Sequence, residues 1–145
     1  MTVGVDLVHV PGFAQQLEDA ASAFVDHTYT PRERRVRDPR RLAARFAAKE
    51  AFIKAWSGSR THQPPLLGSL DLREIEVVDD GYGRPELVLH GTLAQTVGPC
   101  RTSVSLSHDG DAAIAVVLFE DPRSDLQATE AADGVRSQGP PQSGT

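Results

Sequence analysis

Two acidic residues, Asp6 and Glu50, stand where charged side chains are costly unless they bind something. Asp6 lies inside the mostly apolar run 3–10, where an aspartate is disfavoured by strand propensity and by burial. Glu50 and Lys54 are four residues apart in a segment that reads as helix, so both side chains can reach one point. Carboxylates are hard ligands that suit Mg²⁺ or Mn²⁺. Asp6 and Glu50 are therefore candidate metal ligands, and their meeting is an inference because they lie far apart in the sequence.

The helix that carries Glu50 is predicted over residues 40–56, because this stretch is rich in Ala and has no Gly or Pro. At about 100° per residue, three apolar side chains fall within about 40° of one another and form a stripe: Leu42, Phe46 and Ile53. Lys49 and Glu50 flank that stripe and lose part of their hydration, which is costly without a partner. Spacing alone also allows a surface ion pair between Glu50 and Lys54, with Asp6 pointing outward from its strand.

Length and composition fit a single soluble domain. The chain has 145 residues, of which 39% are hydrophobic and 24% charged. Cys100 is the only cysteine, so no intrachain disulfide and no cysteine-based metal site is expected. No apolar run approaches the length of a membrane span, and the N-terminus has no basic region followed by an apolar one. We expect a protein of the reducing cytoplasm, not a membrane protein.

An arginine-rich stretch interrupts this acidic chain, whose net charge is -5. Residues 31–49 hold eight basic side chains but only two acidic ones, Glu33 and Asp38. Such a local excess is a candidate docking face for an anionic partner, although a solvated arginine-rich helix is the alternative. Nucleic acid is not favoured, because the pI is about 5.5 and no aromatic residues alternate with the arginines. The candidate docking residues are Arg32, Arg34, Arg35, Arg37, Arg40 and Arg41.

The remaining pattern predicts an α+β fold in which a small antiparallel sheet packs with helices on one side. The strand-like runs are 3–10, 71–79, 84–90, 101–108 and 112–119, and further helices are expected over 11–24 and 91–98. Thr30-Pro31-Arg32-Glu33 is a capping box that begins a helix, and Pro39 ends it. Asp109-Gly110 predicts a hairpin. Residues 57–69 read as a loop. The domain is expected over 1–120, and the polar stretch 121–145 as a disordered tail.

Several common catalytic patterns are absent. The chain has no Gly-x-x-x-x-Gly-Lys-Ser/Thr or Gly-x-Gly-x-x-Gly loop for a nucleotide, and no Gly-x-Ser-x-Gly elbow for a nucleophile. Its histidines are too far apart in sequence for a helical zinc pair. Ser107-His108-Asp109 does not make a triad, because contiguous residues of a strand point to opposite faces.

Three motifs nevertheless give the chain a resemblance to a known family. They are Gly4-Val5-Asp6-Leu7-Val8, the Lys-Glu-Ala-x-x-Lys motif in residues 45–55 with Thr30-Pro31-Arg32-Glu33 upstream, and Val104-Ser105-Leu106-Ser107-His108-Asp109 with Gly83-Arg84-Pro85 before it. In this order and spacing they resemble the holo-[acyl-carrier-protein] synthases, the small bacterial class of 4′-phosphopantetheinyl transferases. The resemblance covers most of the first 120 residues and implies the phosphopantetheinyl transferase fold.

This resemblance implies transfer of the phosphopantetheine arm of coenzyme A to a serine of apo-acyl carrier protein, with release of adenosine 3′,5′-bisphosphate. It assigns Mg²⁺ to Asp6 and Glu50, and it leaves open whether Glu50 or a metal-bound water removes the serine proton. Lys54 would stabilise charge on the leaving phosphate. The residues expected to hold the nucleotide are Arg45, Lys49, Arg84, Pro85, Ser107 and His108.

The resemblance also implies partners. Acyl carrier proteins are acidic helical bundles, which the arginine stretch would meet. The family is typically a homotrimer with its sites between subunits, so coenzyme A would touch two chains. Two other functions stay open. One is a metal-dependent nuclease, because Asp6, Glu50 and Lys54 imitate an acid–acid–lysine core, although the acidic pI and the Ser-His strand count against it. The other is a catalytically silent subunit that binds a carrier protein.

Overall fold

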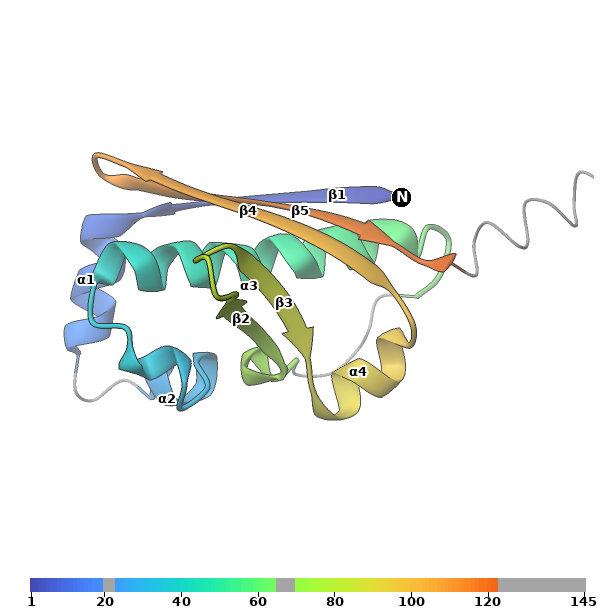
Figure 1. Ribbon diagram of the computed structural model, residues 1–145, viewed down its shortest axis with the longest axis horizontal. Coiled ribbons are helices and arrows are strands. Elements are labelled where there is room, and N and C mark those ends of the chain that lie inside the picture. The colour runs from blue at the N-terminus through green and yellow to red at the C-terminus, as the bar shows by residue number, and fades with distance from the viewer. Residues whose placement is uncertain (20–22, 65–69, 123–145) are drawn as a thin grey trace, which may run out of the picture.

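The computed structural model describes residues 1–19, 23–64 and 70–122, and it confirms the α+β class (Figure 1). The elements follow in the order β1 (Thr2–His9), α1 (Val10–Glu18), α2 (Phe24–Thr28), the 3₁₀ turn η1 (Glu33–Arg35), α3 (Pro39–Ser59), the 3₁₀ turn η2 (Leu72–Glu74), β2 (Ile75–Asp79), β3 (Pro85–Leu89), α4 (Gly91–Val97), β4 (Arg101–Asp109) and β5 (Ala112–Glu120). Nearly all of the predicted tail lies outside the described residues. Within the described part of the chain, no helix is long and apolar enough to cross a membrane.

The strands form two antiparallel sheets where a single sheet was expected. One has the order β1-β5-β4 and the other is the pair β2-β3. The chain leaves β3 for α4 before it enters β4, so β3 touches β4 without joining its sheet. The long helix α3 runs beneath the three-stranded sheet and also contacts β2 (Figure 1). The edge strands β1 and β4 thus lie on either side of β5, above α3.

Helix α3 is buried over most of its circumference. The single apolar stripe expected from the sequence therefore underestimated how much of the helix is buried. Leu42 is buried, but Phe46 and Ile53 are only half-buried, whereas Phe52 on another side of the helix is fully buried. Packing from the sheet on one side and β2 on another explains why no single stripe describes this helix. Small residues allow the sheet to approach it closely: Ala43, Ala44, Ala47, Ala48, Ala51 and Ala55 are buried.

Gly4 marks a close approach between β1 and α3. A Cβ atom at Gly4 would lie 1.8 Å from the backbone oxygen of Ala51, a distance that no side chain allows. Glycine is therefore required at this point of the strand. Because Asp6 follows Gly4 on the same face of β1, and Glu50 precedes Ala51, this contact brings the two acids to one region of the fold.

The predicted helix over 11–24 is wrong as a single element. Helix α1 ends at Glu18 and a separate short helix, α2, begins at Phe24. In one straight helix, Phe13 and Phe24 would be about 16 Å apart along the axis. Instead their ring centroids are 5.7 Å apart, and Phe24 also packs 5.5 Å from Phe46. The aromatic cluster therefore packs α2 back against α1.

Three further boundaries differ from the sequence-based expectation. The capping box forms, since the amide of Thr30 donates to Glu33 Oε2 at 2.9 Å and the amide of Glu33 donates to Thr30 Oγ1 at 3.2 Å. The helix it begins is only the turn η1, because the segment ahead of Pro39 is too short to continue. The run 71–79 begins as η2, capped by Asp71, before β2. Helix α3 extends to Ser59, into the expected loop 57–69, of which residues 65–69 lie outside the described residues.

Candidate functional site

Asp6 and Glu50 line one open groove between β1, α1 and α3, as expected. Phe13 and Phe46 contribute apolar side chains to the lining of this groove, and His9 also lines it. His9 caps α1 by accepting a hydrogen bond from the amide of Gly12 at 3.4 Å. The two carboxylates therefore face a space that is partly apolar and open to solvent.

Lys54 pairs with Asp6 and not with Glu50. Its ammonium donates to Asp6 Oδ1 at 2.8 Å and to the backbone oxygen of Val5 at 3.1 Å. The hydrogen bond to Asp6, followed by the negative charge of Asp6, raises the pKa of Lys54. The alternative of a simple Glu50–Lys54 surface pair is therefore wrong, because the lysine spans from the helix to the strand.

Glu50 is the carboxylate left without an ion pair among the described residues. Partial burial raises its pKa above the usual range, and the charge of Asp6 raises it further, against a smaller opposing effect of Lys54. Ionisation of Glu50 in this groove therefore lowers the stability of the folded protein. A cation beside the carboxylate, or a proton on it, would reduce that loss.

The donor set fits magnesium better than zinc. No group of three or more His, Cys, Asp or Glu side chains able to hold a metal is present among residues 1–19, 23–64 and 70–122. Magnesium usually binds proteins through one or two carboxylates and takes its other ligands from water and substrate phosphate. Asp6 and Glu50 supply such a pair, and Glu50 has no competing ion pair in the described structure.

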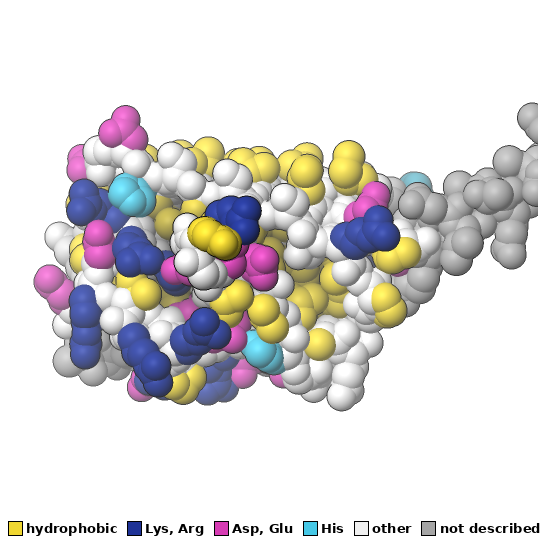
Figure 2. All heavy atoms as spheres, viewed as in Figure 1, with side chains coloured by type: hydrophobic (Ala, Val, Ile, Leu, Met, Phe, Trp, Pro, Cys, Tyr) yellow, Lys and Arg dark blue, Asp and Glu magenta, His cyan; other side chains and the backbone are white. Residues whose placement is uncertain are grey.

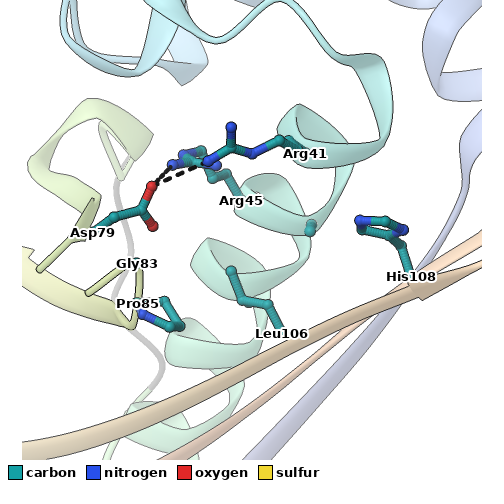
Figure 3. A pocket seen from close by; sticks show the side chains of 8 residues that line it. Arg41, Arg45, Asp79, Gly83, Pro85, Leu106 and His108 are labelled. Carbon is teal, nitrogen blue, oxygen red and sulfur yellow. Dashed lines mark hydrogen bonds and ion pairs between the residues drawn. The ribbon is translucent and has the colours of Figure 1, made fainter. Parts of the chain in front are cut away.

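A second pocket lies on the other side of α3, between this helix, the β2–β3 turn and β4. Arg45 and His108 line it together with Gly83, Pro85 and Leu106 (Figure 3). The structure thus gathers three residues expected at the nucleotide, namely Arg45, Pro85 and His108. The side chain of Arg45 is only 6% exposed, and its Nε atom is buried without a hydrogen-bond partner in the described part of the chain. An unsatisfied buried guanidinium nitrogen beside a pocket suits an anionic ligand.

Arg84 and Ser107 do not line this pocket within one chain. Arg84 is mostly exposed, donates from Nε to Asp80 Oδ2 at 2.6 Å and stacks on the ring of Tyr82. Ser107 is exposed and follows Leu106 on β4, so it points to the opposite face of the sheet. The geometry of one chain therefore separates these residues from His108.

Lys49 is buried and its expected contact with a nucleotide is wrong for this chain. Its ammonium is fully enclosed, donates to Glu33 Oε2 at 2.8 Å and donates to the backbone oxygens of Leu72 and Ile75 at 3.0 and 2.5 Å. All three hydrogens of the ammonium are used in these bonds. Lys49 therefore joins α3 to η1 and to the start of β2.

The candidate docking arginines are all exposed. Dark blue side chains gather on the left of the view in Figure 2, over α2 and the start of α3. Arg34 pairs with Asp26, and Arg40 with Asp38 at 3.4 Å. Among the described residues, no ion pair is found for Arg32, Arg35 or Arg37. Arg32, Arg35 and Arg37 are therefore the free arginines of the candidate docking set.

Arg41, one of the expected docking residues, also lines the same pocket as Arg45. Asp79, at the end of β2, accepts hydrogen bonds from both arginines (Figure 3). Sequence reasoning missed Asp79 and did not anticipate that Arg41 also lines this pocket. The spacing of Arg41 and Arg45, four residues apart on a helix, was a usable signal that they share a face.

Comparisons with known proteins agree with this geometry. A family model described as the 4′-phosphopantetheinyl transferase superfamily matches residues 2–117. The chain belongs to this superfamily. It is 48% identical to a holo-[acyl-carrier-protein] synthase of Mycobacterium tuberculosis (strain ATCC 25618 / H37Rv) over 126 residues, which cover 83% of this chain and 96% of that protein.

Solved structures extend the similarity to the fold. The Chronobacterium ammoniagenes ACPS-CoA complex matches with a TM-score of 0.76 and 45% identity, over 82% of this chain and 96% of that one. A holo-(acyl-carrier-protein) synthase from Bacillus anthracis in complex with CoA (3′,5′-ADP) matches with a TM-score of 0.62 and 25% identity, over 83% of this chain and 96% of that one.

Proposed function

We propose that this protein is a holo-[acyl-carrier-protein] synthase, which transfers 4′-phosphopantetheine from coenzyme A to a serine of apo-acyl carrier protein. Membership of the superfamily and the relatives' names and ligands support this. The observation that carries the proposal is the groove lined by Asp6 of β1 and Glu50 of α3, with Lys54 of α3 paired to Asp6. We assign the transferase domain to residues 1–120 and expect it in the cytoplasm.

In this reaction the serine Oγ bonds to the β-phosphorus of coenzyme A, and the bond from that phosphorus to the bridging oxygen breaks. Adenosine 3′,5′-bisphosphate leaves. Either Glu50, which lines the groove and has no ion pair among the described residues, or a water held beside it is suited to accept the serine proton. Lys54 is suited to stabilise charge on the leaving phosphate, and Asp6 and the backbone oxygen of Val5 fix its ammonium.

We assign a magnesium ion to Asp6 and Glu50. When bound, such an ion neutralises pyrophosphate charge. The chain's own contribution is to hold two carboxylates in one groove, with Gly4 allowing β1 to approach α3 closely enough.

A complete site requires two copies of the chain. The groove of Asp6 and Glu50 and the pocket of Arg45 and His108 lie on different sides of α3. Glu50 and Arg45 are five residues apart, which is about 140° around the helix axis. The pyrophosphate and the 3′-phosphate of coenzyme A are separated only by a ribose, whereas a helix with its side chains is about 10 Å wide. We therefore assign the groove to one subunit and the nucleotide pocket to its neighbour.

The outer face of the three-stranded sheet is suited to join such copies. The exposed apolar side chains on it are Val3, Val5, Leu7, Ile114 and Leu118. Hydrophobic spheres line the corresponding upper rim in Figure 2. Ser103, Ser105 and Ser107 complete this face from β4. A contiguous apolar face of this kind is characteristic of a protein interface, and we propose a homotrimer.

The function is tested by incubating the full chain with coenzyme A, Mg²⁺ and an apo-acyl carrier protein, and weighing the carrier by mass spectrometry. A gain of one phosphopantetheine is expected, with none when the acceptor serine is replaced by alanine or a chelator is added. Binding of the carrier without a mass gain would instead indicate a silent subunit. Degradation of added DNA would indicate a nuclease. Either result without transfer would overturn the proposal.

A further inference from the structure

A single carboxylate links the two arginines of the nucleotide pocket. Asp79 Oδ2 lies 2.8 Å from a terminal nitrogen of Arg45 and 3.2 Å from one of Arg41. Figure 3 shows both guanidinium groups directed at Asp79, with His108 across the pocket. One negative charge thus faces two positive ones, and the pocket keeps an excess of positive charge.

The two arginines differ in how firmly they are held. The side chain of Arg45 is 6% exposed, so its position is fixed by packing, whereas that of Arg41 is 53% exposed. Exposed ion pairs contribute little to stability, because water competes for both partners. Arg41 can therefore exchange Asp79 for another anion at low cost, while Arg45 stays in place.

A phosphate monoester is the anion that suits this exchange. It is close to doubly charged at neutral pH and offers three acceptor oxygens, whereas a carboxylate carries one charge. Guanidinium groups bind phosphate oxygens with directed, charge-assisted hydrogen bonds. The nucleotide end of coenzyme A carries such a group on the ribose 3′ oxygen.

We propose that Arg41 is a further specificity-determining residue, which Asp79 holds at the pocket until the 3′-phosphate of the nucleotide replaces it as the partner of Arg41. This inference rests on the proposed function. Asp79 orients both arginines in the free protein and competes with the phosphate for them. Arg41 thereby belongs to the nucleotide pocket and not to the surface that meets the carrier protein.

The test compares two ligands that differ only in the 3′-phosphate. Binding of adenosine 3′,5′-bisphosphate and of adenosine 5′-monophosphate is measured by calorimetry on the full chain at fixed ionic strength. Arg41→Gln should weaken bisphosphate binding about fivefold, as expected for one half-exposed charged contact, and leave monophosphate binding unchanged. Asp79→Asn should tighten bisphosphate binding severalfold, since the amide oxygen can still accept from Arg45 but no longer competes as an anion.

The pair Arg73–Asp71 supplies matched controls, because it is also a partly exposed arginine–aspartate pair, with side-chain exposures of 48% and 37%. Arg73→Gln and Asp71→Asn change the net charge equally and should leave both affinities unchanged. In turnover, Arg41→Gln should raise KM for coenzyme A and leave kcat unaltered, since the contact is the same in ground and transition states.

Equal weakening of both ligands by Arg41→Gln, or weaker bisphosphate binding in Asp79→Asn, would overturn the proposal and leave the pair a purely structural one. If the wild-type protein transfers phosphopantetheine but neither Arg41→Gln nor Asp79→Asn changes bisphosphate binding, this inference alone is refuted. A wild-type protein that neither transfers nor binds the bisphosphate would refute the proposed function and this inference with it.

Discussion

The ammonium of Lys49 and the carboxylate of Glu33 form an ion pair 2.8 Å long in which both side chains are fully buried. Glu33 also accepts hydrogen bonds from the amides of Thr30 and Val77, and Lys49 donates to two backbone oxygens. Burial of the charges is costly, and these bonds satisfy the donors and acceptors that burial removes from water. The pair thus joins η1, α3 and β2 at one point.

Lys49→Met should destabilise the fold by about 3–5 kcal/mol, because it leaves the Glu33 carboxylate buried without a cation. Urea unfolding measures this loss. Lys54→Met is the matched control, since its pair with Asp6 has the same length but an exposed lysine, and it should change stability little. Adding Glu33→Gln to Lys49→Met should restore part of the stability. A Lys49→Met protein as stable as the wild type would show that the pair contributes nothing.

Sequence reasoning placed correctly those candidate site residues whose positions follow from their own helix or strand. Asp6 is conspicuous because it interrupts an apolar strand, and Glu50 and Lys54 because they are spaced along a helix. Lys49 could not be placed by periodicity, because its burial depends on Glu33 and on backbone oxygens near β2, far away in the chain. Asp79 was missed for the same reason, since only the fold brings the end of β2 to α3.

Glu50→Gln should abolish most transfer and yet raise the melting temperature at pH 7.5 without metal. Burial and Asp6 raise the pKa of Glu50 in the folded protein above its ordinary value of 4.5. Stability therefore falls as the pH rises from about 4.5 through the folded pKa, and the full cost is present above both. The variant removes this cost, so a gain of a few degrees is expected at pH 7.5 but none at pH 4.

Magnesium provides the companion measurement for Glu50. Titration of Mg²⁺ should raise the melting temperature of the wild type, because binding to the folded state is linked to stability. The same titration should have less effect on Glu50→Gln, which keeps only one of the two proposed carboxylate ligands. Identical shifts in the two proteins would place the ion elsewhere.

Two inactive variants should complement each other if the site is shared between chains. Glu50→Gln disables the groove and His108→Glu places a negative charge in the nucleotide pocket. In an equal, randomly assembled mixture, about a quarter of the sites would combine an intact groove with an intact pocket. Co-expressed variants should therefore recover about a quarter of wild-type activity. No recovery in mixed oligomers would mean that each chain holds a complete site.

The outer sheet face can be tested without an activity assay. Val3→Glu should dissociate the oligomer, since it would bury a carboxylate from every copy in an apolar interface. Light scattering after gel filtration measures the mass. Gln95→Glu adds the same charge at an exposed position of α4 and should leave the mass unchanged. An unaltered oligomer in Val3→Glu would exclude this face as the interface.

The free arginines should serve the carrier protein and not coenzyme A. Arg35 and Arg37 are exposed, lie outside the nucleotide pocket and have no ion pair among the described residues, so reversing both to glutamate adds repulsion without breaking a structural contact. We expect kcat/KM for an acidic carrier protein to fall about tenfold, with KM for coenzyme A nearly unchanged.

The wild-type rate should itself decline with added salt, because screening acts over about 8–10 Å at ordinary ionic strength. Gln95→Glu, at an exposed position of α4, is the control and should leave both constants near the wild-type values. A double reversal that weakens coenzyme A and spares the carrier would place the nucleotide on this surface and the carrier elsewhere.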